Sequence, residues 1–368
     1  DSYSNDDHGH LAQVTTTLSG GLLALFSASG ADGADGAGSL SSSLRLVGIP
    51  SGGSLATTLS ATDGGPIRLA MAGNDVVGLD SDGDVVLRLA IVDLGDGEYQ
   101  LQTTQYEALD HGDNATFDEA VSLLLAAGGS LSLQYSVTRV DGDGDSITRS
   151  ASIPLVTASS SVLSFDDDGP SVVASLNTAA VVALDESATG SQTSDIDTLT
   201  YPKGDDLHVA GSGAISKATS GAPIVTVTSE AYGADGPAPL QAKVFELVVN
   251  NSNSGLKVTD GSPITLQLLS NGVVIGIVAG GAFNGQVAFA VSISASGVVA
   301  VEQYLSLQHP LSAVPDDTVS LLAGTLGVKV ILTDGDGDQV ASSVDISGSV
   351  RFDDDGPSVV ASLNTAAV

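Results

Sequence analysis

The sequence contains no cysteine, no tryptophan and only one methionine among 368 residues. The absence of cysteine excludes disulfides, thiolate nucleophiles and cysteine-based zinc sites. Basic residues are also scarce, because 11 Lys and Arg stand against 44 Asp and Glu, which gives a formal net charge of -33. Nucleic-acid binding needs Lys and Arg to release counterions from the phosphates, so we expect no nucleic-acid partner.

Long hydrophobic runs are missing as well. No apolar stretch approaches the roughly 18 residues of a membrane helix, and we expect no membrane insertion. The segment Asp1–Asp7 lacks the basic and apolar regions of a signal peptide. The sequence therefore predicts a cytoplasmic protein or a fragment of one exported by a signal elsewhere. The hydrophobic fraction of 42% excludes a disordered acidic tail, since a chain this apolar can bury a core.

Internal repeats organise the chain. Phe165–Val181 recurs without a change as Phe352–Val368. Further matching blocks precede the two copies in the same order: Asp141–Asp145 with Asp334–Asp338, Gln105, Tyr106 and His111 with Gln303, Tyr304 and His309, Thr62–Ile67 with Thr259–Ile264, and the Gly-Ala-Asp-Gly turns of 30–36 with 233–236. Matching blocks in one order indicate tandem homologous units with loop insertions.

These repeats predict three segments of a longer array. Residues 1–165 form a first unit that is divergent and truncated at its N-terminus, and residues 166–352 form a second unit. Residues 353–368 begin a third. A unit of about 187 residues is long for a simple sandwich of about 100, so it is either an enlarged sandwich or two lobes.

The local pattern predicts an all-β fold. Alternation of apolar and polar residues marks strands over Leu131–Val137, Ile264–Leu268, Val287–Ile293 and Val328–Leu332. Asn-Gly, Asp-Gly and Ser-Gly turns between such runs are typical of hairpins, and many short strands indicate tandem β-sandwich or Ig-like units. Helical signals are confined to one or two turns expected at Phe117–Val121 and at Pro315–Val319.

Carboxylates gather in glycine-containing turns. Alternate aspartates with glycine between them let several carboxylates converge, and they repel one another unless a cation lies among them. Calcium takes six to eight oxygen ligands in flexible geometry, whereas magnesium demands stricter geometry. We therefore predict Ca²⁺ as the bound ion, with these ligand candidates: Asp141, Asp143, Asp145, Asp334, Asp336 and Asp338. An EF-hand is excluded because Ser146 and Gln339 replace its sixth-position glycine. The alternative for each block is a solvated hairpin turn without metal.

An Asp-Asp-Asp-Gly-Pro segment lies at each repeat boundary. Proline fixes φ and glycine relaxes it, so the segment indicates a defined junction, and we predict calcium-binding linkers there. The candidates are Asp166, Asp167, Asp168, Asp353, Asp354 and Asp355, and the alternative is a flexible acidic linker. Weaker metal candidates are Asp80, Asp82, Asp84, Asp185, Glu186 and Asp235; each of them is also compatible with an ordinary surface carboxylate.

Catalytic motifs are missing from the sequence. It has no Gly-x-Ser-x-Gly elbow, phosphate-binding loop or His-Glu-x-x-His helix. His111 and His309 occupy equivalent places and are interpreted as turn or core-edge residues, while His8 and His10 fit a solvated loop that binds metal only adventitiously. A glycosidase with paired carboxylates remains open, but aromatics for stacking sugars make up only 4%. We expect no enzyme.

The order Thr333–Asp338, an apolar strand, then Phe352–Pro357 resembles the tandem repeats of giant repeats-in-toxin (RTX) adhesins of bacteria, which are exported by type I secretion. The second unit covers that pattern almost entirely, with Leu184–Ser187, Gly233–Gly236 and Gln303–Pro310. The first unit departs from it, since it lacks the opening strand and has a different run at 106–112, which weakens any site carried over to it. The resemblance implies an extracellular, cell-surface array of calcium-stiffened sandwiches whose export signal lies at a C-terminus outside this sequence.

Two functions follow as expectations. The first is a calcium-rigidified extender in cell adhesion and biofilm formation, whose partners are the neighbouring repeats of the same adhesin. The second is a module that binds a glycan or peptide through the divergent first unit, with a host or biofilm surface ligand as partner. We expect a monomer in either case.

Overall fold

The computed structural model describes residues 10–354 except 17, 96, 113–119, 187–213, 312–313 and 315–316, together with 361–362. The chain forms two compact units. Unit 1 contains Asp1–Pro170 and two loops from the second repeat, Tyr232–Pro239 and Asp334–Gln339. Unit 2 contains Ser171–Ala231, Leu240–Thr333 and Val340–Val368.

The larger sheet of unit 1 has the strand order β1-β7-β6-β5-β4-β3. Neighbouring strands in this sheet are antiparallel and mostly joined by short turns, as in a meander. The strand bounds are β1 Ala12–Thr15, β3 Ser54–Ala61, β4 Gly65–Ala72, β5 Asp75–Leu79, β6 Val85–Asp93 and β7 Tyr99–Gln105. A short 3-10 turn, η1, spans Leu22–Leu25.

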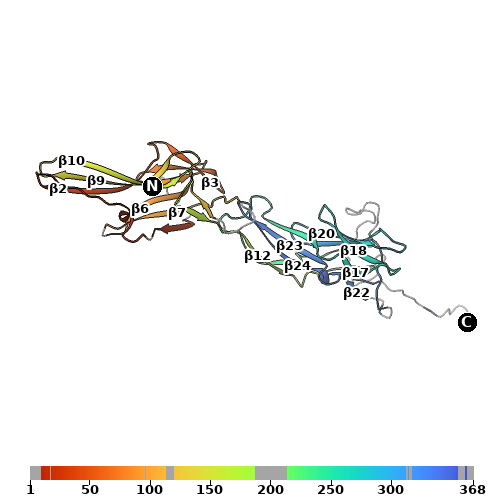
Figure 1. Ribbon diagram of the computed structural model, residues 1–368. Coiled ribbons are helices and arrows are strands. Elements are labelled where there is room, and N and C mark those ends of the chain that lie inside the picture. The colour runs from red at the N-terminus through yellow and green to blue at the C-terminus, as the bar shows by residue number, and fades with distance from the viewer. Residues whose placement is uncertain are drawn as a thin grey trace, which may run out of the picture. The chain divides into compact units, whose positions relative to one another are not determined.

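A second sheet of unit 1 has the order β10-β9-β2, and β11 pairs with β8 beside it. Figure 1 shows β2, β9 and β10 as long neighbouring strands. Their bounds and those of the small pair are β2 Ala37–Val47, β9 Ser130–Asp141, β10 Ser146–Thr157, β8 Ala120–Ser122 and β11 Ser164–Asp166. Leu46, Leu131 and Leu133 of this sheet share one core with Leu69 and Leu87 of the larger sheet. The unit is therefore sandwich-like.

Unit 2 repeats this plan with sheets β14-β21-β20-β19-β18-β17 and β16-β23-β24. Val328 and Val330 of β23 share a core with Ile264 of β18 and Phe289 of β20. The bounds are β14 Ser216–Thr219, β16 Lys243–Val249, β17 Asn253–Lys257, β18 Pro263–Leu268, β19 Val274–Val278, β20 Val287–Ile293, β21 Val299–Gln303, β23 Leu326–Thr333 and β24 Gln339–Asp345.

Unit 2 also has strands beside these two sheets, and one antiparallel pair of them matches the β8–β11 pair of unit 1. Strands β12 (Ser171–Leu176) and β15 (Val225–Ala231) pair with each other. Strand β13 (Val182–Asp185) runs parallel to β25 (Val350–Asp353), which also pairs with β22 (Thr318–Ser320). A 3-10 turn, η2, spans Ser347–Ser349.

The prediction of an all-β fold is confirmed, and the four predicted strands lie in β9, β18, β20 and β23. The predicted helical turns are wrong for the residues that can be checked, because Ala120–Ser122 and Thr318–Ser320 are strands. Val121 and Val319 pair with Phe165 and Phe352, and this partly buried cross-strand packing outweighs the helix-start signal. Within the described ranges, no helix is long and apolar enough to cross a membrane.

Candidate metal centres

The two Asp-Gly-Asp-Gly-Asp blocks form the same tight turn. The Oδ1 atom of Asp334 accepts hydrogen bonds from the N–H groups of Gly337 at 3.2 Å and Asp338 at 2.7 Å. In the first repeat, Asp141 Oδ1 accepts from the N–H of Asp145 at 2.8 Å. The fourth residue has a positive φ in both turns, 101° at Gly144 and 107° at Gly337, which favours glycine. The first aspartate therefore holds the turn with its Oδ1 atom, and its Oδ2 atom is not needed for the hydrogen bonds of the turn.

A Gly-Ala-Asp-Gly turn packs on the second residue of each block. A Cβ atom on Gly142 would lie 2.1 Å from the carbonyl oxygen of Asp35, and one on Gly335 would lie 2.4 Å from that of Asp235. Only glycine permits so close a backbone approach. The glycine of the motif thus has a structural task, because it brings a further aspartate to the carboxylates of the turn.

Two equivalent carboxylate clusters result. The first-repeat cluster consists of Asp35, Asp141 and Asp143, and the second-repeat cluster consists of Asp235, Asp334 and Asp336. In each cluster, one carboxylate oxygen from every residue lies within 4.8 Å of the others. Such a spacing allows three oxygens to bind one calcium ion, whose Ca–O distances are about 2.4 Å. Both clusters lie within unit 1 as defined above.

The second-repeat cluster is removed from solvent. Asp334 is 0% exposed. Burial, with the hydrogen bond and charge of Asp336, raises the pKa of Asp334 to about 7. Burial also raises the pKa of Asp235, and the charges of Asp336 and Asp167 raise it further. A 2.6 Å hydrogen bond donated by Thr62 Oγ1 acts in the opposite direction and lowers this pKa. Carboxylates held this way repel one another unless a proton or a cation lies between them.

The first-repeat cluster lies in a more open setting. Asp35 and Asp143 are exposed and Asp141 is half-buried. The hydrogen bond with Asp143 and the backbone N–H groups of the turn lower the pKa of Asp141. The carboxylates of Asp35 and Asp143 remain in contact with water, so a cation bound here would be accessible to solvent.

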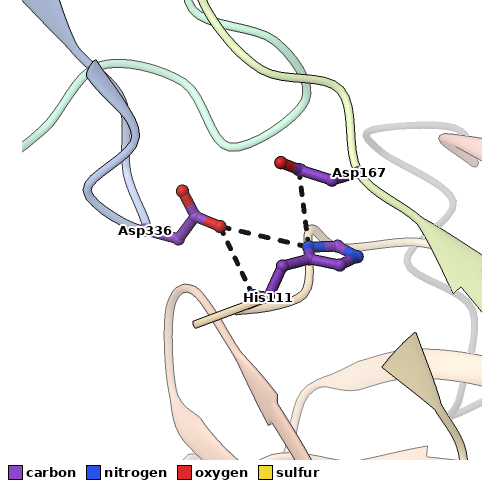
Figure 2. A group of neighbouring side chains, drawn as sticks. All are labelled: His111, Asp167 and Asp336. Carbon is purple, nitrogen blue, oxygen red and sulfur yellow. Dashed lines mark hydrogen bonds and ion pairs between the residues drawn. The ribbon is translucent and has the colours of Figure 1, made fainter. Parts of the chain in front are cut away.

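His111 extends the second-repeat cluster. Figure 2 shows its Nδ1 edge facing Asp167 and Asp336, with Nδ1 3.4 Å from Asp167 Oδ1 and 4.0 Å from Asp336 Oδ2. The backbone N–H of His111 also donates to Asp336 Oδ2 at 3.4 Å. All three side chains are at least nine-tenths buried, with exposed fractions of 4%, 1% and 2%. We call His111, Asp167 and Asp336 the His111 group.

The junction segment 165–168 alternates its side chains as a strand does. Phe165 is buried, Asp167 points into the His111 group, and Asp166 and Asp168 are exposed. Gly233 of the adjacent loop lies against Asp168, since a Cβ there would be 1.7 Å from the Asp168 carbonyl oxygen. Of the three predicted junction ligands, the structure thus brings one to a cluster.

An equivalent group occurs in unit 2. His309, Asp317 and Asp354 each place one ligand atom within 4.8 Å of the others, and we call them the His309 group. The His309 Nδ1 atom lies 3.6 Å from Asp317 Oδ1, and Nε2 lies 4.0 Å from Glu186 Oε1. Glu186 Oε1 also accepts hydrogen bonds from Gln303 and from the N–H of Leu307, and burial raises its pKa.

The remaining predicted ligands lie beside these groups or apart from them. Asp185 is buried in β13 and pairs in register with Asp353, whose carboxylate accepts a hydrogen bond from Thr318. Asp145 is exposed, Asp338 is buried, and neither is among the cluster residues. Asp355 lies outside the described residues.

The Asp80–Asp84 turn has a different role. Asp80 Oδ1 accepts hydrogen bonds from the N–H groups of Asp82, Gly83 and Asp84 at 2.7–3.0 Å. These bonds tie the carboxylate to its own hairpin. Among the residues that the structure describes, Asp80, Asp82 and Asp84 belong to no cluster of three potential ligands.

Sequence reasoning missed several members of these groups. His111, His309 and Asp317 were not predicted as ligands, and Thr62 was known only as part of a repeated block. The available signal was the equivalent position of the two histidines in the two repeats. Their pairing with Asp167 and Asp354 is a long-range contact that spacing does not reveal.

Comparisons with known families identify the chain. A family model described as Domain of unknown function (DUF5801) matches residues 4–154 and again 181–347. The chain belongs to this family. The two matched regions fall within the two sequence repeats. No curated protein matches the chain.

Solved structures with some similarity include cadherin ectodomains. The structure "Protocadherin Gamma B2 extracellular cadherin domains 3-6" matches with 8% identity and a TM-score of 0.20, covering 86% of this chain and 51% of that chain. The "Protocadherin GammaB4 extracellular domain" matches with 10% identity and a TM-score of 0.17, covering 85% and 33%. This chain thus spans about half or less of these proteins. With TM-scores this low, neither match establishes a common fold.

Proposed function

We propose that this chain is a calcium-binding structural segment of a large extracellular adhesin. One observation carries the proposal: a Gly-Ala-Asp-Gly turn and an Asp-Gly-Asp-Gly-Asp turn build the same three-carboxylate cluster in both repeats. In both repeats the Asp-Gly-Asp-Gly-Asp turn depends on one glycine, Gly142 or Gly335, at which a side chain would collide with the backbone of the Gly-Ala-Asp-Gly turn.

Calcium fits the chemistry of these clusters better than other ions. Their ligands are carboxylate oxygens on flexible turns, and calcium accepts six to eight oxygens without strict geometry. Backbone carbonyls and waters would complete its coordination shell. The ion would neutralise carboxylates that otherwise raise one another's pKa, as at Asp235 and Asp334.

The clusters suit a role outside the cell. Extracellular calcium-binding modules have Kd values of about 10⁻⁴–10⁻³ M, which extracellular calcium concentrations fill. A ligand that binds only the folded state stabilises it, which compensates for the absence of disulfides in a chain of net charge -33. Together with the resemblance to RTX adhesin repeats, this supports type I export, a cell-surface location and a non-catalytic role in adhesion and biofilm formation.

The composition of unit 1 supports the extender role. Two loops of the second repeat, 232–239 and 334–339, belong to the same unit as the first repeat. A cation held by the second-repeat cluster, and by Asp167 beside it, would tie these loops to the end of the first repeat. Neighbouring repeats of the same adhesin are therefore the proposed partners, and calcium would make their junction rigid.

Calcium titration of the whole chain tests the metal assignment. By calorimetry we expect saturable calcium binding, and by thermal melting a higher Tm in millimolar calcium than in chelator. For a Kd of about 10⁻⁴ M, calcium at about 10 mM is 100 times Kd and adds about 2.7 kcal/mol per site, or on the order of 5–10 °C for a unit of this size. The triple variant D334N/D336N/D338N should lose most of this gain. The variant D80N/D82N/D84N removes the same charge from a turn of the same pattern and should keep it. Equal melting of the unmodified chain with and without calcium would contradict the proposal.

Small-angle scattering tests the extender role separately. The maximum dimension should be sharply defined in calcium and broadly distributed in chelator, because removal of the cation frees the junction while the apolar cores persist. A distribution equally broad in both conditions would leave calcium binding intact and would refute the mechanical role.

The exposed first-repeat cluster supports a second candidate function. Asp35 and Asp143 are open to solvent, so a calcium ion there would have coordination positions free for a hydroxyl or carboxylate of a glycan or peptide. Glycan-array binding in calcium, lost in chelator and in D141N/D143N, would establish this role. Binding that persists in the variant would exclude this cluster as the ligand site.

A further inference from the structure

We infer that the His111 group and the His309 group are binding sites for a zinc-class divalent transition metal, distinct in chemistry from the calcium clusters. The inference goes beyond the proposed function. The His111 group shares Asp336 with the second-repeat cluster, whereas the His309 group shares no residue with either carboxylate cluster. Each group combines one imidazole with two carboxylates, His111 with Asp167 and Asp336, and His309 with Asp317 and Asp354.

The first argument is the state of the imidazoles. The side chains of His111 and His309 are each 4% exposed, and none of their four ring nitrogens has a hydrogen-bond partner. A buried polar atom without a partner costs free energy, so buried histidines are ordinarily hydrogen-bonded. Both rings nevertheless turn Nδ1 toward carboxylates. A metal ion bound to Nδ1 would satisfy that atom and the facing carboxylates together.

The second argument is ligand type. Imidazole nitrogen suits zinc and neighbouring transition metals, whereas calcium and magnesium prefer oxygen. The first-repeat and second-repeat clusters contain no histidine, and the His111 group adds an imidazole beside the shared Asp336. One histidine and two carboxylates leave a coordination position of a tetrahedral ion for water or another ligand.

The third argument is distance. Zinc binds histidine nitrogen and carboxylate oxygen at about 2.0–2.2 Å, which places tetrahedral ligand atoms roughly 3.3 Å apart. The Nδ1–Oδ1 distances are 3.4 Å for His111 and Asp167 and 3.6 Å for His309 and Asp317. These distances exceed an ordinary hydrogen bond and approach the edge of a zinc tetrahedron.

The fourth argument is recurrence. His111 and His309 are equivalent in the repeats, and so are Asp167 and Asp354 of the repeated junction segment. The Nε2 atom of His309 lies 4.0 Å from Glu186 Oε1, so a further carboxylate lies near the other nitrogen of this ring. An incidental polar contact would not explain the same combination in both repeats.

Zinc titration in the presence of saturating calcium tests the inference. The full chain should carry H8A/H10A, which removes the N-terminal histidine pair as an adventitious site. The titration is done in 5 mM calcium, which is about five times the weakest Kd of extracellular calcium modules. Calorimetry with ZnCl₂ should then show two zinc ions per chain. Adding H111A or H309A should leave one site, and adding both should leave none. As the matched control, the H8A/H10A chain with D82N/D84N should still bind two.

Two results would overturn the inference. One is zinc binding that is abolished by 5 mM calcium, a concentration at which extracellular calcium sites are about filled. The His111 and His309 groups would then be ordinary calcium sites. The other is zinc binding that persists in the double histidine variant, which would mean adventitious binding only. If a histidine variant fails to fold, ¹H–¹⁵N spectra of the H8A/H10A chain decide instead. Zinc should shift the Nδ1 resonances of two histidines, and unchanged imidazole resonances would refute the site. Calcium titration of the same samples tests the calcium clusters independently.

Discussion

The pentapeptide Asp-Gly-Asp-Gly-Asp occurs twice with the same backbone turn and opposite electrostatics. In the first repeat, hydrogen bonds lower the pKa of Asp141. In the second repeat, burial raises the pKa of the equivalent Asp334 to about 7. Asp143 and Asp145 are exposed, whereas Asp334 and Asp338 are buried.

The difference comes from the surroundings of each turn and not from the turn itself. Among the residues that the structure describes, Asp35 adds a carboxylate to the first turn, and Asp143 and Asp145 are exposed to solvent. Around the second turn lie Asp235, Asp167 and His111 from three other segments of unit 1. Desolvation and the neighbouring negative charges therefore both raise the pKa of Asp334. The comparison teaches that one motif builds a solvent-exposed carboxylate cluster in one setting and a buried one in another.

Neutralising the two turns should produce the largest contrast. In chelator, D334N/D336N/D338N should raise the Tm above that of the unmodified chain, because it removes buried carboxylates that repel one another. In calcium it should lower the Tm and weaken binding roughly tenfold or more, since charge is a main determinant of calcium affinity. Thermal melts in chelator and in calcium measure the predicted rise and the predicted fall in Tm.

The same change in the first turn is the control for that experiment. D141N/D143N/D145N should leave the Tm in chelator nearly unchanged, because exposed carboxylates interact weakly through water. Effects of equal sign and size in the two repeats would contradict the comparison.

Alanine at the central glycine should affect both turns alike. In G142A and in G335A the new Cβ would meet a backbone oxygen of the Gly-Ala-Asp-Gly turn, at 2.1 and 2.4 Å. We expect a loss of about 1–3 kcal/mol in the free energy of unfolding for each variant, as for other overpacking. Urea denaturation measures it, and G83A, where no atom lies within 4 Å but φ is positive, separates strain from collision. A loss in G335A no greater than in G83A would remove the steric argument.

Acidity should stabilise the second cluster when no cation is present. The folded-state pKa of Asp334 is about 7 against an ordinary 3.8, so its protonated form stabilises the fold below about pH 4. That contribution is lost as the pH rises through about 7. In chelator, the Tm of the unmodified chain relative to that of D334N should therefore fall between pH 5 and 8. The interval between the folded and unfolded pKa values of Asp334 sets the free energy of unfolding that is lost. In calcium, the Tm difference between the unmodified chain and D334N should not fall with pH in this way. A Tm difference that rises with pH in chelator would contradict the raised pKa of Asp334.

The Asp80 turn should give the smallest effect. D80N keeps an oxygen that accepts backbone hydrogen bonds, so the loss in stability should stay below about 1 kcal/mol. The calcium stoichiometry should not change. A lost calcium ion in this variant would show that Asp80 is a ligand.

Much of the fold was predictable from the sequence. Alternating residues located β18 and β20, and the repeated blocks located the two turns that hold the clusters. The predicted helical turns failed because cross-strand packing of Val121 and Val319 decides the local structure.

The candidate sites were only partly predictable. Local spacing identified Asp334 and Asp336, but not their burial, which depends on segments far away in sequence. Thr62, His111, Asp167 and Asp235 meet that turn only through the tertiary fold. Of three adjacent junction aspartates, the strand alternation selects Asp167, and this choice requires the register of β11.

A crystal structure of the chain grown in calcium near neutral pH tests the central claim most directly. The account predicts electron density for a cation bound by Asp235, Asp334 and Asp336, with metal–oxygen distances of about 2.4 Å. It also predicts a second cation at Asp35, Asp141 and Asp143. Water at both positions, with the carboxylates turned away from one another in saturating calcium, would contradict it.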